Sequence, residues 1–401
     1  MLKMSGNAGR LIKKFASIHL NRTLPRVTTK PLIVTHIEAS RTLYCKASLG
    51  IDNFELQKVR TKHQLSNLEE KFKERMREYV SDEKNMIFTE DLKNMVYLTD
   101  NDQDVELVVA MIKRFNKQNQ QLRFGSFKFG PIVMRMFHVL NKPQLAIECF
   151  QDTENFPGFF DQLVSFQTYL DLLYNNGMYK EVLEGFQQIE QKQLEGALFP
   201  RNSFVIALAA CYKLNTKESL EYALQIWNKA KEYGYYPTRR AITFCSALAL
   251  NQGKPEVALE MVSSANNQNY TTIRNIKALA LTDMGRLVDA IVVLKSVLSI
   301  ERGEHTFNKD VIDKIKTAVL ACDSPEITVE FNKVHQLLQK QGNITEKTLD
   351  DQLSCEIQKP PQPPQGQFNK DGGNYRSGGF NQRQNLRPNF RKERPGLEDL
   401  V

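Results

Sequence analysis

A short apolar pattern that returns at a nearly constant spacing constrains the fold of this chain more than any other feature. It consists of a small residue, an aliphatic residue, two spacers and a large apolar residue. Its copies are 146–150 (Ala-Ile-x-x-Phe), 182–186 (Val-Leu-x-x-Phe), 223–227 (Ala-Leu-x-x-Trp), 258–262 (Ala-Leu-x-x-Val) and 290–294 (Ala-Ile-x-x-Leu). Successive copies begin 36, 41, 35 and 32 residues apart. A period of about 35 residues is typical of a solenoid of helical hairpins, because one hairpin cannot bury its apolar face without a neighbour.

Turn-forming residues divide each repeat into two predicted helices. Five positions before the small residue, four copies carry a residue that tolerates left-handed backbone: Asn141, Gly177, Gly253 and Gly285. After two copies comes a proline, Pro200 or Pro237, which cannot continue the preceding helix. The predicted fold is therefore an all-α solenoid of about six or seven helical hairpins.

Several segments with these turns resemble the pentatricopeptide repeat family. They are residues 164–167 (Val-Ser-Phe-Gln), 176–183, 231–238, 253–259 and 285–291. The resemblance implies a right-handed solenoid whose first helices line a concave groove for single-stranded RNA. A tetratricopeptide scaffold has a similar pattern, since both kinds of repeat place a small residue where helices cross.

The resemblance also implies which residues would read RNA bases. The principal base-reading positions of the family correspond to Pro131, Gln167, Val205, Thr243 and Asn275, and the companion positions lie near Arg201 and Thr238. Only Thr243 and Asn275 are residue types that the family uses for hydrogen-bonded recognition, and Val205 offers no hydrogen bond at all. This departure favours recognition by shape and backbone charge over a base-by-base code.

The net charge of +8 is concentrated at the two ends of the sequence. Residues 1–50 carry nine basic side chains and one acidic side chain, and residues 359–401 carry eight basic and four acidic ones. Residues 51–358 therefore have a net charge of −4. The total charge thus says nothing about nucleic acid, and the distribution of charge must carry that argument.

Residues 1–45 have the features of a mitochondrial transit peptide. They are basic and almost free of acid, and Leu11, Phe15 and Ile18 fall on one helical face. A cleavage point is expected near Arg41, which would place the mature protein in the mitochondrial matrix. A basic arm that binds nucleic acid is the alternative.

A basic stretch free of acidic residues lies between Leu107 and Ile147. Its cations are Lys113, Arg114, Lys117, Arg123, Lys128, Arg135 and Lys142. Such cations neutralise RNA phosphates, and interleaved aromatic residues can stack on unpaired bases. We expect the five phenylalanines of the stretch to be core residues. The charged residues fit two interpretations equally well: an RNA contact or an ordinary solvent-exposed face.

The segments around the repeats have distinct patterns. Residues 51–87 are predicted to be an N-terminal helical cap, with one helix over 53–79, and the repeats are predicted to span residues 88–342. Residues 88–112 should form a degenerate first helical pair. Residues 359–401 are rich in glycine and arginine with interspersed aromatics, so we expect a disordered tail. Its arginines, among them Arg376, Arg383 and Arg387, are candidates for a loose RNA contact.

No motif for catalysis, a cofactor or a metal appears in the sequence. The six cysteines are scattered without paired spacing, and the six histidines are isolated from one another. No apolar run reaches the roughly 18 residues needed to span a membrane. The predicted function is non-catalytic binding of mitochondrial RNA during its processing, maturation or stabilisation. A protein–protein scaffold, for example a mitochondrial ribosome-associated component, is the alternative, and RNA-processing factors are further expected partners.

Overall fold

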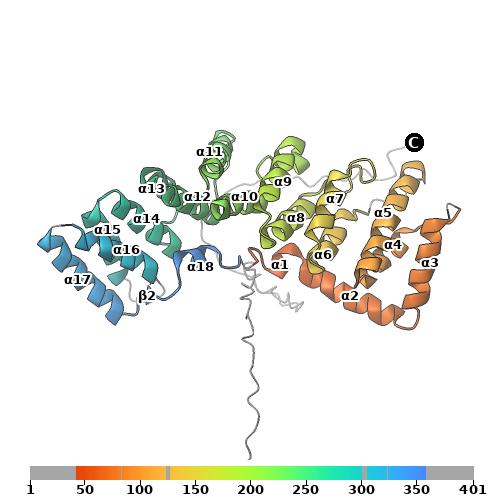
Figure 1. Cartoon of the computed structure of the whole chain (residues 1–401), viewed down its shortest axis with the longest axis horizontal. Helices are drawn as coiled ribbons and strands as arrows, with labels where there is room; N and C mark the ends of the chain where they lie inside the picture. The colour runs from red at the N-terminus through yellow and green to blue at the C-terminus, as the bar shows by residue number, and fades with distance from the viewer. Residues whose placement is uncertain (1–41, 83, 123–126, 300–304, 323, 358–401) are drawn as a thin grey trace, which may run out of the picture. The chain divides into compact units, whose positions relative to one another are not determined.

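Stacked helices make up most of the described part of the chain in the computed structural model (Figure 1). The structure describes residues 42–82, 84–122, 127–299, 305–322 and 324–357, and all of these belong to one compact unit. The expected all-α solenoid of helical hairpins is confirmed. The predictions for the transit peptide up to residue 41 and for the tail from residue 359 concern residues outside this described part.

Six consecutive hairpins form the main stack of the described chain. Their first helices, called A helices below, are α6 (Gly130–Val139), α8 (Leu163–Asn175), α10 (Arg201–Leu214), α12 (Arg239–Asn251), α14 (Thr271–Asp283) and α16 (Lys309–Leu320). Their second helices, called B helices, are α7 (Pro143–Gln151), α9 (Tyr179–Lys192), α11 (Lys217–Glu232), α13 (Pro255–Ser263), α15 (Leu287–Leu298) and α17 (Pro325–Lys340). A short 3-10 helix, η1 (Leu194–Gly196), follows α9.

The repeated pattern occupies the B helices and explains how they pack. The small residue of every copy is completely buried: Ala146, Val182, Ala223, Ala258 and Ala290. A small side chain at this point lets the neighbouring helices approach closely. The four predicted turn residues have positive φ angles between 49° and 73°, as a left-handed turn between the A and B helices requires.

Five helices of the described chain precede α6, whereas the sequence predicts three: one cap helix and the pair over 88–112. They are α1 (Lys46–Leu49), α2 (Ile51–Leu65), α3 (Glu69–Ser81), α4 (Thr89–Leu98) and α5 (Asp102–Leu122). The single helix expected over 53–79 is wrong, because the chain turns between α2 and α3. This turn lets α3 pack against α5 and bury Met76. The helical pair expected over 88–112 is present as α4 and α5.

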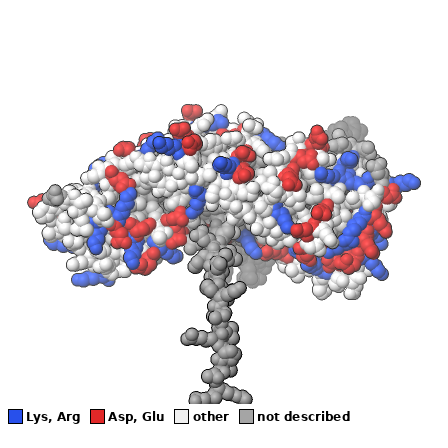
Figure 2. Space-filling model, viewed as in Figure 1, with Lys and Arg blue, Asp and Glu red and all other residues white. Residues whose placement is uncertain are grey.

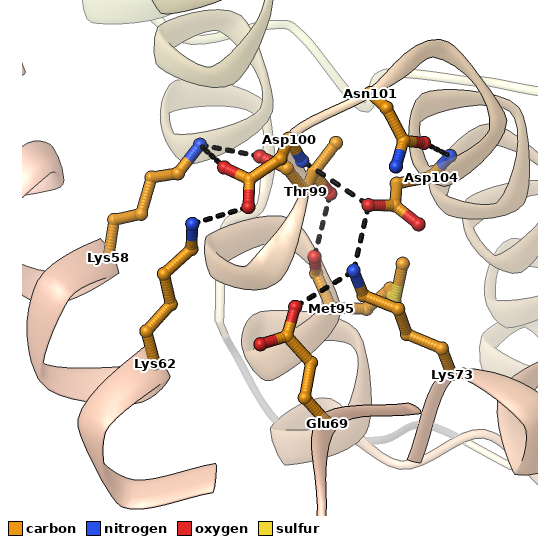
Figure 3. Close-up of polar contacts among 9 residues, drawn as sticks. All are labelled: Lys58, Lys62, Glu69, Lys73, Met95, Thr99, Asp100, Asn101 and Asp104. Atoms are coloured by element: carbon orange, nitrogen blue, oxygen red, sulfur yellow. Dashed lines mark hydrogen bonds and ion pairs between the residues drawn. The ribbon is translucent and has the colours of Figure 1, made fainter. Parts of the chain in front are cut away.

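A buried ion pair fixes α3 against α5 (Figure 3). The Lys73 ammonium lies 2.9 Å from the Asp104 carboxylate, and their side chains are only 6% and 2% exposed. Glu69 adds a second contact to Lys73 at 2.9 Å. Nearby, Asp100 pairs with Lys58 and Lys62 of α2. Burial acts to raise the pKa of the Asp100 carboxyl, but the two ammonium groups outweigh it and hold the pKa below its usual value.

The C-terminal end of the described chain returns to the A helices. Strand β1 (Phe307–Asn308), just before α16, pairs in parallel with β2 (Ile344–Thr345), which follows α17. The short helix α18 (Leu349–Leu353) then contacts α12 and α14 (Figure 1). Among the described helices, none is both long enough and apolar enough to cross a bilayer.

Candidate nucleic-acid interface

The side of the stack formed by the A helices, called the A-helix face below, is where the family resemblance places RNA. On this face Thr243 and Asn275 are completely buried. The Thr243 hydroxyl donates to the carbonyl of Arg240 at 3.0 Å. Gln167 is half-buried, and its Oε1 accepts a hydrogen bond from Asn202 Nδ2 at 3.2 Å. All three candidate base-reading side chains therefore bond within the chain.

Asn275 binds the protein's own backbone where the resemblance implies a base. Its Nδ2 donates to the carbonyls of Thr271 and Thr306 at 2.8 and 3.3 Å, and its Oδ1 accepts from the Asn308 N–H at 3.0 Å. Asn308 Nδ2 in turn donates to the carbonyls of Lys347 and Thr348 at 2.9 and 3.3 Å. This chain of bonds connects α14 to the segment that follows α17.

That segment, residues 343–357, is called the C-terminal strap below, and it lies across the A-helix face. The Phe307 N–H donates to the carbonyl of Asn343 at 2.8 Å, and the Leu349 N–H donates to Asp310 Oδ2 at 2.9 Å. Leu349 and Leu353 are buried against the stack. The strap thus combines apolar burial with backbone pairing, and contacts α12, α14 and the start of α16.

The strap engages three cations of the A helices: Arg240, Lys213 and Lys309. Arg240 of α12 donates to the carbonyls of Leu353, Cys355 and Gln352 at 2.7, 3.0 and 3.3 Å. Lys213 of α10 lies 2.9 and 3.1 Å from the two carboxylate oxygens of Asp350. A guanidinium that donates to several carbonyls fixes a peptide in one orientation.

The strap is acidic, so it also changes the charge of the A-helix face. It carries four acidic side chains (Glu346, Asp350, Asp351 and Glu356) and one basic one, Lys347. Glu346 pairs with Lys309 at the start of α16, with 2.7 Å between Oε2 and Nζ. Carboxylates and carbonyls of the strap therefore occupy Lys213, Arg240 and Lys309 of the A helices.

The N-terminal segment meets the end of the strap. The Ile357 N–H donates to the Leu43 carbonyl at 2.8 Å, and the Cys45 N–H donates to the Ile357 carbonyl at 3.3 Å. The buried Tyr44 hydroxyl donates to the Asn202 carbonyl of α10 at 3.3 Å. Burial, and to a lesser extent the nearby Asp171 carboxylate, raise the pKa of this hydroxyl, so it remains a donor.

Most described cations of the basic stretch 113–142 hold the fold together. Arg114 donates to the carbonyls of residues 82 and 85, both at 3.0 Å, and Arg135 donates to the carbonyl of residue 49 at 2.8 Å. Lys142 lies 2.6 Å from Asp102, and Lys113 lies 3.4 Å from Asp152. These contacts face different neighbours, so the structure does not bring the four cations together into one basic surface.

The remaining residues of that stretch divide between surface and core. Lys117 and Lys128 are exposed, whereas Arg123 lies outside the described residues. Phe115, Phe129 and Phe137 are buried, which confirms that they are core residues, whereas the same prediction is wrong for Phe127, which is exposed. Phe124 lies outside the described residues. Figure 2 shows basic and acidic side chains interspersed over the visible face, with no large basic area. Arg376, Arg383 and Arg387 also lie outside the described part of the chain.

No periodic pattern marks residues 343–357, so the sequence did not predict the strap or its contacts with Arg240 and Lys213. The signal in the sequence was the group of acidic residues within 346–356, which could have been matched with basic residues near the ends of the A helices. No group of three or more His, Cys, Asp or Glu among the described residues is placed to hold a metal ion.

Helical hairpins stacked with their first helices on one side define an α-helical repeat protein. A relative from Danio rerio named "Pentatricopeptide repeat-containing protein 2, mitochondrial" is 30% identical over 320 residues, which cover 79% of this chain and 81% of the relative. Proteins of the same name from Mus musculus and Homo sapiens are 27% and 26% identical over 344 and 335 residues, covering 82% and 80% of this chain and 88% and 84% of theirs. The chain belongs to the pentatricopeptide repeat-containing protein 2 family. No protein-family model matches the sequence.

Proposed function

We propose that this protein is a non-catalytic RNA-binding protein of the mitochondrial matrix. Its role is to support the processing, maturation or stability of single-stranded mitochondrial RNA and thereby respiratory-chain gene expression. The observation that carries the proposal is the unbroken run of hairpins from α6 to α17 in a member of a pentatricopeptide repeat family. The mitochondrial location is supported by the acid-poor residues 1–45 and by the names of the relatives.

Recognition by shape and backbone charge fits this chain better than a base-by-base code. Thr243 and Asn275 are completely buried and hydrogen-bonded within the fold, so neither side chain presents a group to a base edge. Among the described cations of the basic stretch, Lys117 and Lys128 are exposed and offer contacts to phosphates. The arginines of the tail extend this contact in the proposal.

Ultraviolet crosslinking and sequencing of RNA bound to the tagged protein in mitochondria tests the proposal. A form that lacks residues 359–401 is compared with the full chain. Sharp peaks on a transcript that persist without the tail support repeat-based RNA binding. An absence of crosslinked RNA from both forms refutes it.

A binding assay with purified protein separates phosphate contacts from fold effects. The variant K117E/K128E should weaken binding of single-stranded RNA and flatten its salt dependence, because two exposed phosphate contacts are lost. The control K316E/K340E makes the same change of charge on exposed residues of α16 and α17. Equal loss of binding in both variants would mean that only net charge matters.

A protein–protein scaffold remains a second candidate because of one apolar groove. The groove lies between α15 and α17, has a volume of about 940 Å³ and is lined by Leu298, Val329 and Leu337 among others. Val329 and Leu337 are exposed, as are Val288 and Val292 of α15. An exposed apolar surface of this kind suits a protein partner, such as the mitochondrial ribosome or an RNA-processing factor. A partner that co-purifies after ribonuclease treatment and in high salt would favour the scaffold.

A further inference from the structure

A second pocket lies between two neighbouring loops, each of which connects one hairpin to the next. It lies between the loop from α11 to α12 and the loop from α13 to α14, and its volume is about 630 Å³. Its principal polar and aromatic lining residues are Arg201, Lys231, Tyr236, Arg239, Asn266 and Tyr270. Pockets of roughly 300–1,000 Å³ are large enough to enclose most of a small organic ligand.

The pocket is positively charged without a compensating acid. Arg201, Lys231 and Arg239 line it, and no Asp or Glu does. Glu232 follows Lys231 in the sequence but is not a lining residue. None of the three cations forms an ion pair with a carboxylate in the described part of the chain, in contrast to Lys213 and Lys309 on the A-helix face.

Aromatic rings stand beside these cations. The Tyr236 side chain is 85% exposed, although burying a tyrosine ring is ordinarily favourable. The Arg239 guanidinium carbon lies 4.1 Å from the centre of the Tyr270 ring, so arginine and tyrosine form one stacked surface. Exposed aromatic rings next to cations that have no acidic partner are suited to bind single-stranded bases and their phosphates.

The start of α12 adds to the attraction for an anion. Thr238 caps this helix of 13 residues, and its hydroxyl accepts from the Ala241 N–H at 3.4 Å. Thr238 and Arg239 both line the pocket, so the positive end of the helix dipole lies at its wall. No residue of the strap lines the pocket.

We propose that this pocket holds one unpaired nucleotide of a bound RNA. The base stacks on Tyr236, and the phosphate lies among Arg201, Lys231 and Arg239. The inference rests on the proposed RNA-binding function. It locates the contact at the loop edge, away from Thr243 and Asn275, and it gives the companion positions at Arg201 and Thr238 a role at the phosphate while Tyr236 holds the base. The phosphate contact is independent of base identity, so the site adds affinity with little sequence preference.

Photocrosslinking of the full chain to single-stranded RNA that contains 4-thiouridine tests the site, with mass spectrometry to identify the modified peptide. We expect a crosslink within residues 231–239. In an affinity measurement with the same RNA, Tyr236→Ala should weaken binding about ten-fold, which is the effect of losing one stacked base. Tyr236→Phe keeps the ring and should stay within about two-fold of the unmodified protein.

Charge variants test the phosphate contact separately. Arg239→Gln should lower the slope of log affinity against log salt by about 1. The matched control is Arg75→Gln, which removes the same charge from an exposed position on α3. Because Tyr236 and Arg239 are exposed, these variants should keep the circular dichroism and thermal unfolding of the parent protein.

The outcomes separate the pocket from the proposed function. If the unmodified protein binds RNA while Tyr236→Ala and Arg239→Gln bind equally well, the pocket is not the site and the RNA-binding function stands. If the crosslink falls only on other peptides, the pocket is likewise excluded. If the unmodified protein binds no single-stranded RNA, the proposed function fails and the pocket proposal fails with it.

Discussion

Replacing Arg240 with alanine should release the C-terminal strap from the A-helix face without unfolding the stack. Arg240 is the one side chain whose guanidinium donates to the carbonyls of Gln352, Leu353 and Cys355 among the described contacts. A hydrogen bond from a charged donor contributes about 1.5–3 kcal/mol. The three bonds share one partly exposed group and are not additive, so we take about 2 kcal/mol for the set.

Hydrogen exchange of the strap amides measures this change directly. The amides of Gln352, Ser354 and Ile357 donate to carbonyls at 3.1, 2.8 and 2.8 Å, so their exchange reports opening of the strap. A loss of about 2 kcal/mol in the opening free energy corresponds to roughly thirty-fold faster exchange. Amides within α8, α10 and α14 should keep their rates, because these helices are held by the core.

Arg239→Ala is the matched control for this experiment. Arg239 is the neighbouring arginine on α12, but its guanidinium packs on Tyr270. Strap exchange in this variant should stay within about three-fold of the parent. If Arg240→Ala also leaves strap exchange within that range, the other strap contacts hold the strap without Arg240 and the electrostatic account is wrong.

Three further predictions concern the stability of the stack. Lys73→Met should lower the free energy of unfolding in urea by about 3–5 kcal/mol, because Asp104 is left buried and charged, and adding Asp104→Leu should restore most of it; a single variant of near-parental stability would contradict this. The folded pKa of Asp100 is lowered, so its stabilising contribution is complete above its unfolded pKa and is lost as pH falls through the folded value. Asp100→Asn should therefore lose stability in urea titrations at neutral pH, and the loss should shrink as pH falls below the unfolded pKa of about 3.9; a loss that does not change with pH would rule out the charge effect. Gly130→Ala should lower the thermal unfolding temperature by an amount equivalent to about 1–3 kcal/mol, because a Cβ would lie 2.6 Å from the Phe159 carbonyl oxygen, and an unchanged midpoint would show that the backbone yields easily.

The periodic part of the fold could be predicted from the sequence because every repeat packs its helices through the same kinds of residue at the same positions. The small residue, the turn residue and the proline recur at matching positions, and each position has one structural role. The break between α2 and α3 was harder to see. The pattern of this region is helical throughout, whereas the contacts that hold α3 in place, such as that of Lys73 with Asp104, join residues 31 positions apart.

The candidate site was less predictable because charge in a sequence does not show which charges are already paired. Arg114 and Arg135 belong to a stretch whose composition suits RNA binding, but both donate to backbone carbonyls in the N-terminal part of the chain. Asn275 has a residue type suited to base recognition and is instead bonded to β1. Only contacts between residues far apart in the chain distinguish these cases, and no local pattern records them.

Pairing of residues 43–45 with Ile357 has a consequence for how the chain folds. In an ordinary solenoid each repeat contacts only its neighbours, so the end repeats can fray without disturbing the middle. Here the contact between Thr42 and Glu356 joins residues 314 positions apart, so opening either end also breaks contacts of the other. The strap should thus make unfolding more cooperative than the repeat architecture alone would. Its pairing also requires nearly all of the described chain, so the A-helix face stays open while the protein is being synthesised and is covered last.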